Sequence, residues 1–246
     1  MNNKLEVIYK FLKDNKSYNH ELQQQEYYST FSYHNGINDK VLSLLYNIAN
    51  SQSQPKIDYL AEFFQFIHED MESLGTFQGF IKRLTGKENG CYHDLFEGLR
   101  NRNGWGDKTS ALFTKVIFNV HNGKFDKSLR IWGDAPNIIS ASDKLFLPVD
   151  AVIIKIFKHL GCKKHSFSSI NKEIRKYSNG ESIVLWDDLW FWGFITQKGS
   201  GESRTIEWNP NKYWSLEHSD KSLNVINCIK QKSEHFIALL NEAKIK

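Results

Sequence analysis

The chain has 246 residues, which is enough for one sizeable hydrophobic core or for two lobes that share a cleft. Hydrophobic residues make up 40% and charged residues 24%, as in an ordinary globular protein, and the low counts of Pro and Gly exclude a low-complexity chain. The formal net charge of +4 suits a polyanionic partner such as a nucleic acid, but it does not require one.

Cysteine usage and hydropathy narrow the class of protein further. Cys91, Cys162 and Cys228 are scattered without a CxxC pair, which argues against a cysteine-ligated zinc site, a four-cysteine iron–sulfur cluster and a disulfide framework. The N-terminal segment lacks a secretory apolar region, and no run reaches the roughly 18 apolar residues of a membrane span. We therefore expect a reduced cytoplasmic protein with no membrane partner.

Apolar residues recur at helical spacing along most of the chain, whereas strict alternation is scarce. We expect helices over 4–13, 39–49, 58–68, 77–84, 92–100, 107–120, 150–160, 167–177, 181–195 and 220–243. Residues 196–218 are polar and typical of a loop. The chain has no internal repeat and no flexible linker, so the pattern predicts one all-α domain over residues 1–246.

The most informative stretch predicts two helices joined by a short glycine turn, a hairpin over about 92–120. The first helix, over 92–100, leads into Asn103-Gly104-Trp105-Gly106, and the second helix begins directly afterwards at Asp107. Two glycines around an apolar residue permit a tight turn with exposed amides, and such amides at a helix start bind phosphate oxygens. Gly104 and Gly106 are therefore candidate contacts to a DNA backbone. The alternative is a plain turn between two helices.

Lys108 follows this turn directly and lies in the first turn of the second predicted helix. The positive end of the helix dipole disfavours an ammonium there, and aromatic neighbours would favour a neutral amine further. A neutral amine is a nucleophile that attacks C1′ of a damaged nucleotide and forms a Schiff base with the opened sugar. The alternatives are a solvated lysine or a lysine that contacts a DNA phosphate.

A second candidate group lies at the start of the helix predicted over 150–160. Pro148 fixes an extended entry, and Asp150 is well placed to cap the helix N-terminus. A capping carboxylate is held rigidly, so it stabilises positive charge at a sugar and assists proton transfer. Capping alone would also explain the residue.

These two motifs together resemble the helix-hairpin-helix DNA glycosylase superfamily. The resemblance rests on the GxGxK pattern that ends at Lys108 and on the Pro-Val-Asp pattern that ends at Asp150, and it implies that these are the catalytic lysine and aspartate. Their separation of 42 positions implies an insertion around 121–146 relative to the endonuclease III-like branch. That branch also carries a cysteine cluster that this chain lacks.

The runs KTSALFTK (108–115) and WDDLWFWG (186–193) look most like the archaeal-type 8-oxoguanine DNA glycosylases. In this resemblance, Asp188 and Trp192 help to hold the flipped base, and Lys115 is a second lysine on the catalytic helix. Gln52 corresponds loosely to a glutamine that reads the purine edge. Core packing is the alternative for Trp192, as for most tryptophans in helices, and Trp105 is expected to point inward.

Together these features predict an all-α, two-lobed globule with an active-site cleft between the lobes. We expect a monomeric base-excision-repair glycosylase and AP lyase that acts on damaged double-stranded DNA in the nucleoid, without a metal or an organic cofactor. The expected lesion is an oxidised purine, 8-oxoguanine. The alternatives are another damaged base, a non-catalytic helix-hairpin-helix DNA-binding module, or an unrelated helical protein in which both motifs are coincidental.

Overall fold

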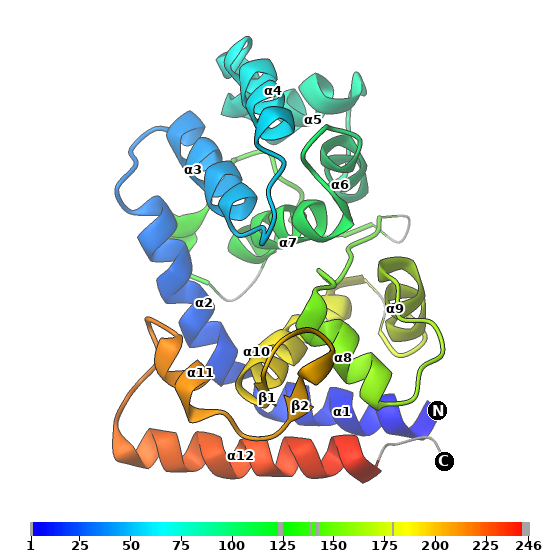
Figure 1. Cartoon of the computed structure of the whole chain (residues 1–246). Helices are drawn as coiled ribbons and strands as arrows, with labels where there is room; N and C mark the ends of the chain where they lie inside the picture. Colours follow the sequence, from blue (N-terminus) through cyan, green and yellow to red (C-terminus); the bar gives the residue numbers. More distant parts are fainter. Residues whose placement is uncertain (1, 123–124, 138, 141–142, 179, 243–246) are drawn as a thin grey trace. The chain divides into compact units, whose positions relative to one another are not determined.

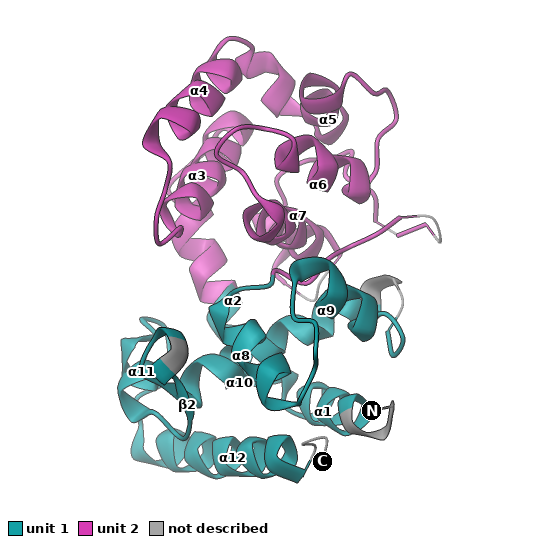
Figure 2. Ribbon diagram, turned by 45° about the vertical axis from the view of Figure 1, so that its right-hand side comes forward, with its two compact units in different colours: residues 1–23, 149–246 teal, residues 24–148 magenta. Residues whose placement is uncertain are grey.

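The computed structural model describes residues 2–122, 125–137, 139–140, 143–178 and 180–242, and these are mostly helical (Figure 1). Helices account for 67% and strands for 2%, which confirms the predicted all-α class. The chain forms two compact units (Figure 2). Unit 1 comprises residues 1–23 and 149–246, and unit 2 comprises residues 24–148, so the chain leaves unit 1 and later returns to it.

Unit 2 is a cluster of helices around α7. Its elements are the C-terminal part of α2 (Lys16–Phe31), α3 (Ile37–Asn50), α4 (Ile57–His68), the 3₁₀ helix η1 (Met71–Gly75), α5 (Phe77–Thr85), α6 (Tyr92–Arg100), α7 (Asp107–Asn122) and the 3₁₀ helix η2 (Lys127–Leu129). Nearly every side chain of α7 between Thr109 and His121 is buried, and α3 and α6 pack against it. A helix covered on all sides is fixed firmly by its neighbours, so the element that carries Lys108 and Lys115 has little freedom.

Aromatic side chains from three segments fill the core of unit 2. Phe80 of α5 packs against Phe113 of α7, with ring centroids 6.0 Å apart, and against Trp132, with centroids 5.8 Å apart. The Trp132 indole donates a hydrogen bond to the carbonyl of Leu74 at 2.7 Å. The segment after α7, predicted as an insertion around 121–146, therefore contributes to the core of this unit.

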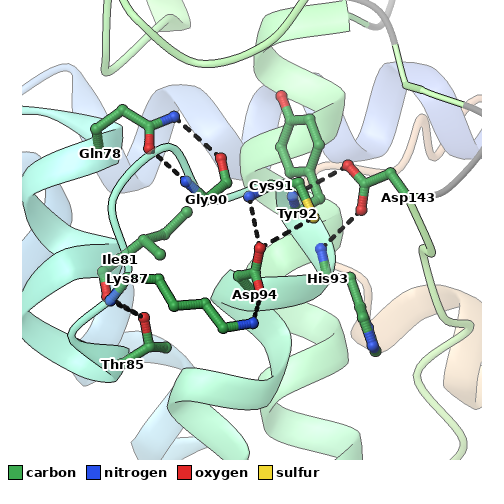
Figure 3. A network of polar contacts seen from close by, with 10 residues as sticks. All are labelled: Gln78, Ile81, Thr85, Lys87, Gly90, Cys91, Tyr92, His93, Asp94 and Asp143. Atoms are coloured by element: carbon green, nitrogen blue, oxygen red, sulfur yellow. Dashed lines mark hydrogen bonds and ion pairs between the residues drawn. The ribbon is translucent and has the colours of Figure 1, made fainter.

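Two aspartates of the same segment cap helices that lie elsewhere in the sequence. The Asp134 carboxylate accepts hydrogen bonds from the first two amides of α5, at 2.8 and 3.0 Å. The Asp143 carboxylate accepts from the first two amides of α6, at 3.1 and 2.8 Å (Figure 3). A negative charge at a helix N-terminus satisfies orphan amides and complements the helix dipole. The connection between α7 and α8 thus fixes the starts of α5 and α6.

Local side chains complete the start of α6 (Figure 3). Asp94 accepts hydrogen bonds from the Cys91 amide at 3.0 Å and from the Cys91 thiol at 3.2 Å, and it forms an ion pair with Lys87 at 2.5 Å. Burial raises the pKa of the Cys91 thiol to about 11, so the thiol remains protonated and able to donate. Cys91 is therefore part of a helix cap.

His121, near the end of α7, accepts hydrogen bonds from the backbone of the segment that follows this helix. Its Nε2 accepts hydrogen bonds from the amides of Ile131 at 3.4 Å and Trp132 at 3.3 Å. Burial lowers the pKa of His121 to about 4, so the ring is neutral and able to accept.

Unit 1 packs the N-terminal and C-terminal helices of the chain together. Its elements are α1 (Asn2–Asp14), the start of α2, α8 (Ala151–His159), α9 (Phe167–Ile174), the 3₁₀ helix η3 (Gly180–Asp187), α10 (Asp188–Ile195), β1 (Gln197–Lys198), the 3₁₀ helix η4 (Gly201–Ser203), β2 (Thr205–Ile206), α11 (Pro210–Ser215) and α12 (Leu223–Glu242). Phe11 of α1 lies between Trp192 of α10 and Phe236 of α12, with ring centroids 5.1 and 5.3 Å away.

Three elements differ from the sequence-based expectation. The helix α2 was not predicted, because most of its side chains are polar and carry no apolar period. The helix expected over 181–195 consists of the 3₁₀ helix η3 and the shorter α10. The expected loop over 196–218 contains a two-residue antiparallel β-hairpin and α11.

Candidate functional site

The turn between α6 and α7 requires glycine at position 104. Gly104 has a φ of +82°, and a Cβ there would lie 2.9 Å from Cδ2 and 3.1 Å from the backbone nitrogen of Leu60. Gln52 donates a hydrogen bond to the Gly104 carbonyl at 3.3 Å, and Asn103 donates to Glu62 at 3.2 Å. The turn therefore rests on the end of α3 and the first half of α4.

This contact gives Gln52 a place in the turn. Its amide group supports the turn by donating to the Gly104 carbonyl, and its predicted role as a reader of a purine edge stays a prediction. The loose alignment in this polar stretch carried no signal for the contact, because the two residues are far apart in the sequence.

The other two turn residues have different roles. Trp105 points inward as expected, with its ring centroid 5.1 Å from that of Phe63 and 6.1 Å from that of Phe113. Gly106 is exposed, and its amide donates to Thr109 Oγ1 at 3.0 Å. The Gly106 amide thus makes a hydrogen bond within the turn, and its predicted role as a phosphate donor stays a prediction. The amides that open α7, at residues 107–109, have no partner within the helix and are the better candidates.

Lys108 is the second residue of α7 and is half-buried. In the described part of the chain, its ammonium makes no hydrogen bond or ion pair. The neighbouring acid, Asp107, forms an ion pair with Arg100 of α6 at 2.6 Å. Lys108 therefore lies in the first turn of a helix, where the one acid of that turn, Asp107, is bound to Arg100.

The other basic side chains of the hairpin region are engaged within unit 2. The contacts are Lys82 with Glu88 at 2.5 Å, Arg83 with Glu69 at 3.1 Å, Lys87 with Asp94 at 2.5 Å, Arg100 with Asp107 at 2.6 Å, and Arg102 with the Leu84 carbonyl at 2.7 Å. Of the basic residues around the turn, Lys108 alone lacks a partner among the described residues.

Lys115 lies seven residues after Lys108, on the same side of α7, and is only 7% exposed. Ser110 and Thr114 on this helix are also buried, and their hydroxyl oxygens have no hydrogen-bond partner among the described residues. The buried part of α7 thus carries one lysine on the side of Lys108 and two hydroxyl groups on other sides of the helix.

Asp150 caps α8, as predicted. Its Oδ1 accepts hydrogen bonds from the amides of Val152 at 2.9 Å and Ile153 at 3.0 Å. Its Oδ2 accepts a hydrogen bond from the indole nitrogen of Trp190 at 3.0 Å. Both oxygens are thus held, and the carboxylate is fixed in one orientation. Sequence analysis did not link Trp190 to Asp150, because Trp190 lies 40 residues away and on another helix.

Asp188 and Trp192, predicted to bind a base, both lie inside unit 1. Asp188 is 8% exposed and accepts a hydrogen bond from Asn19 at 2.7 Å. Trp192 is 0% exposed and is enclosed by Phe11 and Phe236 together with other aromatic side chains. Trp192 is a core residue in this structure and offers no face to a base, which corrects its predicted role.

Two amide side chains of α2 donate hydrogen bonds to Asp187 and Asp188 at the start of α10. Asn19 donates to Asp188, and Gln23, one helical turn later, donates to Asp187 at 2.5 Å. Sequence analysis missed both amides because it did not predict α2. They make the start of α10 a polar cluster within unit 1.

No significant match was found when the chain was compared with protein-family models, with curated proteins and with solved structures. Within the described residues, no helix is long and apolar enough to cross a membrane, and no group of three or more His, Cys, Asp or Glu side chains is suited to hold a metal ion.

Proposed function

We propose that this protein is a DNA glycosylase with AP lyase activity that removes an oxidised purine, 8-oxoguanine, from double-stranded DNA through a Schiff base on Lys108. In this proposal α6, the glycine turn and α7 act as a helix-hairpin-helix clamp on the DNA backbone. The proposal requires Lys108 and Asp150 to reach the same nucleotide.

The state of Lys108 is the observation that carries this proposal. Lys108 is a half-buried lysine in the first turn of α7, and the neighbouring acid, Asp107, is bound to Arg100, so the Lys108 side chain is available to act as a nucleophile. The neighbouring basic residues are engaged in ion pairs, so Lys108 differs from them in having no partner among the described residues.

Asp150 supplies the second group that the reaction needs. Its carboxylate is held by two backbone amides and one indole, so it needs no reorganisation when positive charge develops on a sugar. An Asp that served only as a helix cap would not need the additional Trp190 contact.

The chemistry follows from these roles. Nζ of Lys108 attacks C1′ of the damaged nucleotide while the bond from C1′ to the base breaks, and the base leaves with the electron pair and gains a proton. Asp150 stabilises the charge that develops on the sugar. The sugar ring then opens to an imine between Lys108 and C1′. Loss of a proton from C2′ expels the 3′ phosphate, and water hydrolyses the imine to restore Lys108.

Base recognition is assigned to polar groups because a purine presents hydrogen-bonding edges. Asp188 remains a candidate, now together with Asn19 and Gln23 of the same cluster. Lys115 is a candidate from α7, since it follows Lys108 on the same side of the helix. A lesion other than 8-oxoguanine would use the same catalytic pair with a different set of these polar groups.

Borohydride trapping tests the proposal. The protein is incubated with a duplex that contains 8-oxoguanine or an abasic site, and borohydride then reduces any Schiff base to a stable protein–DNA adduct. We expect an adduct with 8-oxoguanine that is absent in Lys108→Gln. An adduct with the abasic site alone would keep the mechanism and overturn the lesion. Binding without any adduct would favour a non-catalytic DNA-binding module.

A further inference from the structure

A cation-rich site lies beside Asp150 in the segment that the sequence analysis left as a loop. Lys212 of α11 places its Nζ 4.8 Å from the ring centroid of Phe194. The Phe194 ring stacks on that of Trp190, with centroids 4.9 Å apart and planes at 11°. Trp190 in turn donates to Asp150. An ammonium, two stacked rings and the candidate catalytic carboxylate thus form one continuous column within unit 1.

Hydrogen bonds hold the segment that carries Lys212 against α8. The Gln197 side chain, which is fully buried, donates to the Val152 carbonyl at 3.0 Å and accepts from Arg204 at 3.1 Å. Asn209 donates to the Gln197 carbonyl at 3.0 Å and caps α11. These contacts hold Arg204 and Lys212 at the end of α8 where Asp150 lies, so the segment is a built part of this region.

Lys212 and Arg204 both have hydrogen-bond donors that no described residue uses. The Lys212 ammonium makes no hydrogen bond or ion pair with the described residues, although it is half-buried. Partial burial and the nearby charge of Arg204 lower the pKa of Lys212, and the Asp150 carboxylate opposes that effect. Arg204 uses one donor on Gln197, and a guanidinium has five. The carboxylate near Lys212 is itself occupied by the α8 amides and Trp190.

We propose that Lys212 and Arg204 bind a phosphodiester of the damaged DNA strand, next to the nucleotide on which Asp150 acts. A phosphodiester provides the anionic acceptor oxygens that both cations lack, and the Phe194 ring limits access of water to one side of the ammonium. This inference rests on the proposed function, because that function brings a DNA strand to Asp150. It assigns the segment 196–218 a role in gripping the DNA backbone.

Salt-dependent DNA binding tests the inference. The ligand is a duplex with a tetrahydrofuran abasic analogue, which binds without forming a Schiff base, and affinity is measured by fluorescence anisotropy over a salt series. For Lys212→Gln we expect about threefold to tenfold weaker binding and a salt slope that is smaller by about 1. Lys212→Arg should retain the slope. The matched control is Lys230→Gln on α12, where the lysine is exposed and its nearest acid is 3.9 Å away.

A second set of binding measurements identifies the phosphate that Lys212 contacts. Single phosphates that flank the analogue are replaced with uncharged methylphosphonates. One such replacement should weaken the wild-type protein as much as Lys212→Gln does and should not weaken that variant further. If the wild type binds and traps DNA while Lys212→Gln keeps the full affinity and slope, the inference fails and the proposed function survives. If the wild type neither binds nor traps DNA, both fail.

Discussion

Lys108 in unit 2 and Asp150 in unit 1 both lie at the N-terminal end of a helix, but they differ in how their charge matches the helix dipole and in their hydrogen-bond partners. Asp150 has the charge that this position favours and receives three hydrogen-bond donors. Lys108 has the charge that it disfavours and receives no partner from the described residues. The difference shows that Asp150 is held by its neighbours while Lys108 is not, which fits the two roles that the proposed function gives them.

Replacing Asp150 separates its capping role from its proposed catalytic role and should give the largest effect. Asn caps a helix about as well as Asp, but its amide nitrogen cannot accept the Trp190 hydrogen bond as Oδ2 does, so Asp150→Asn should lose about 1 kcal/mol of stability. Because the negative charge is lost, single-turnover base release should slow by about 10²- to 10³-fold. Asp150→Ala should lose the rate as well and about 2 kcal/mol of stability, because the cap is also lost. If Asp150→Asn released the base as fast as the wild type, Asp150 would be only a helix cap and not a catalytic group.

Acid should weaken the unit that carries Lys108 through His121. The pKa of His121 is about 4 in the folded protein, against 6.5 for a free histidine, so the unfolded chain binds the proton more readily. Neutral His121 therefore contributes to the free energy of unfolding. This contribution is complete above pH 6.5, is lost as the pH falls toward 4, and amounts to about 3 kcal/mol at most. Chemical denaturation at pH 7.0 and 4.5 measures it. His121→Gln should unfold with a smaller pH dependence, and an unchanged dependence would contradict the assignment.

The two glycines of the turn offer a matched pair in unit 2. Gly104→Ala places a Cβ against Leu60 at a positive φ and should destabilise the protein by about 1–3 kcal/mol. A Cβ at Gly106 meets nothing within 4 Å and the residue lacks a positive φ, so Gly106→Ala should cost about 1 kcal/mol or less. Denaturant titration compares them. Equal losses would show that the turn is not held against α4.

Trp190→Phe gives the smallest expected effect and tests how tightly Asp150 is held. The variant keeps an aromatic ring to stack on Phe194 but loses the donor to Oδ2 of Asp150. We expect single-turnover base release to slow by about tenfold, with little change in affinity for the tetrahydrofuran duplex, because the indole positions the carboxylate and not the DNA. A loss of affinity with an unchanged rate would assign Trp190 to DNA binding instead.

Sequence analysis found features that depend on local signals. The glycine turn before Lys108 and the cap formed by Asp150 are encoded within a few residues, and the structure contains both. The inward position of Trp105 follows from its place between two glycines in a short turn.

Features set by distant contacts were missed for a physical reason. α2 has no apolar period, and its side chains Asn19 and Gln23 bond to residues more than 160 positions away. The Trp190–Asp150 hydrogen bond likewise joins residues that are remote in the sequence. Trp192 was assigned to a base-binding site because its spacing from Asp188 fits one helical face, and no local pattern shows that α1 and α12 enclose it.

Mapping the trapped adduct tests the central claim most directly. The wild-type protein is reduced with borohydride on a duplex that contains 8-oxoguanine, digested with trypsin and nuclease, and analysed by mass spectrometry. The account predicts a deoxyribose-derived mass on Lys108 and on no other lysine. An adduct on Lys115 or Lys212, or a protein that binds the duplex yet yields no adduct on either 8-oxoguanine or an abasic site, would contradict it.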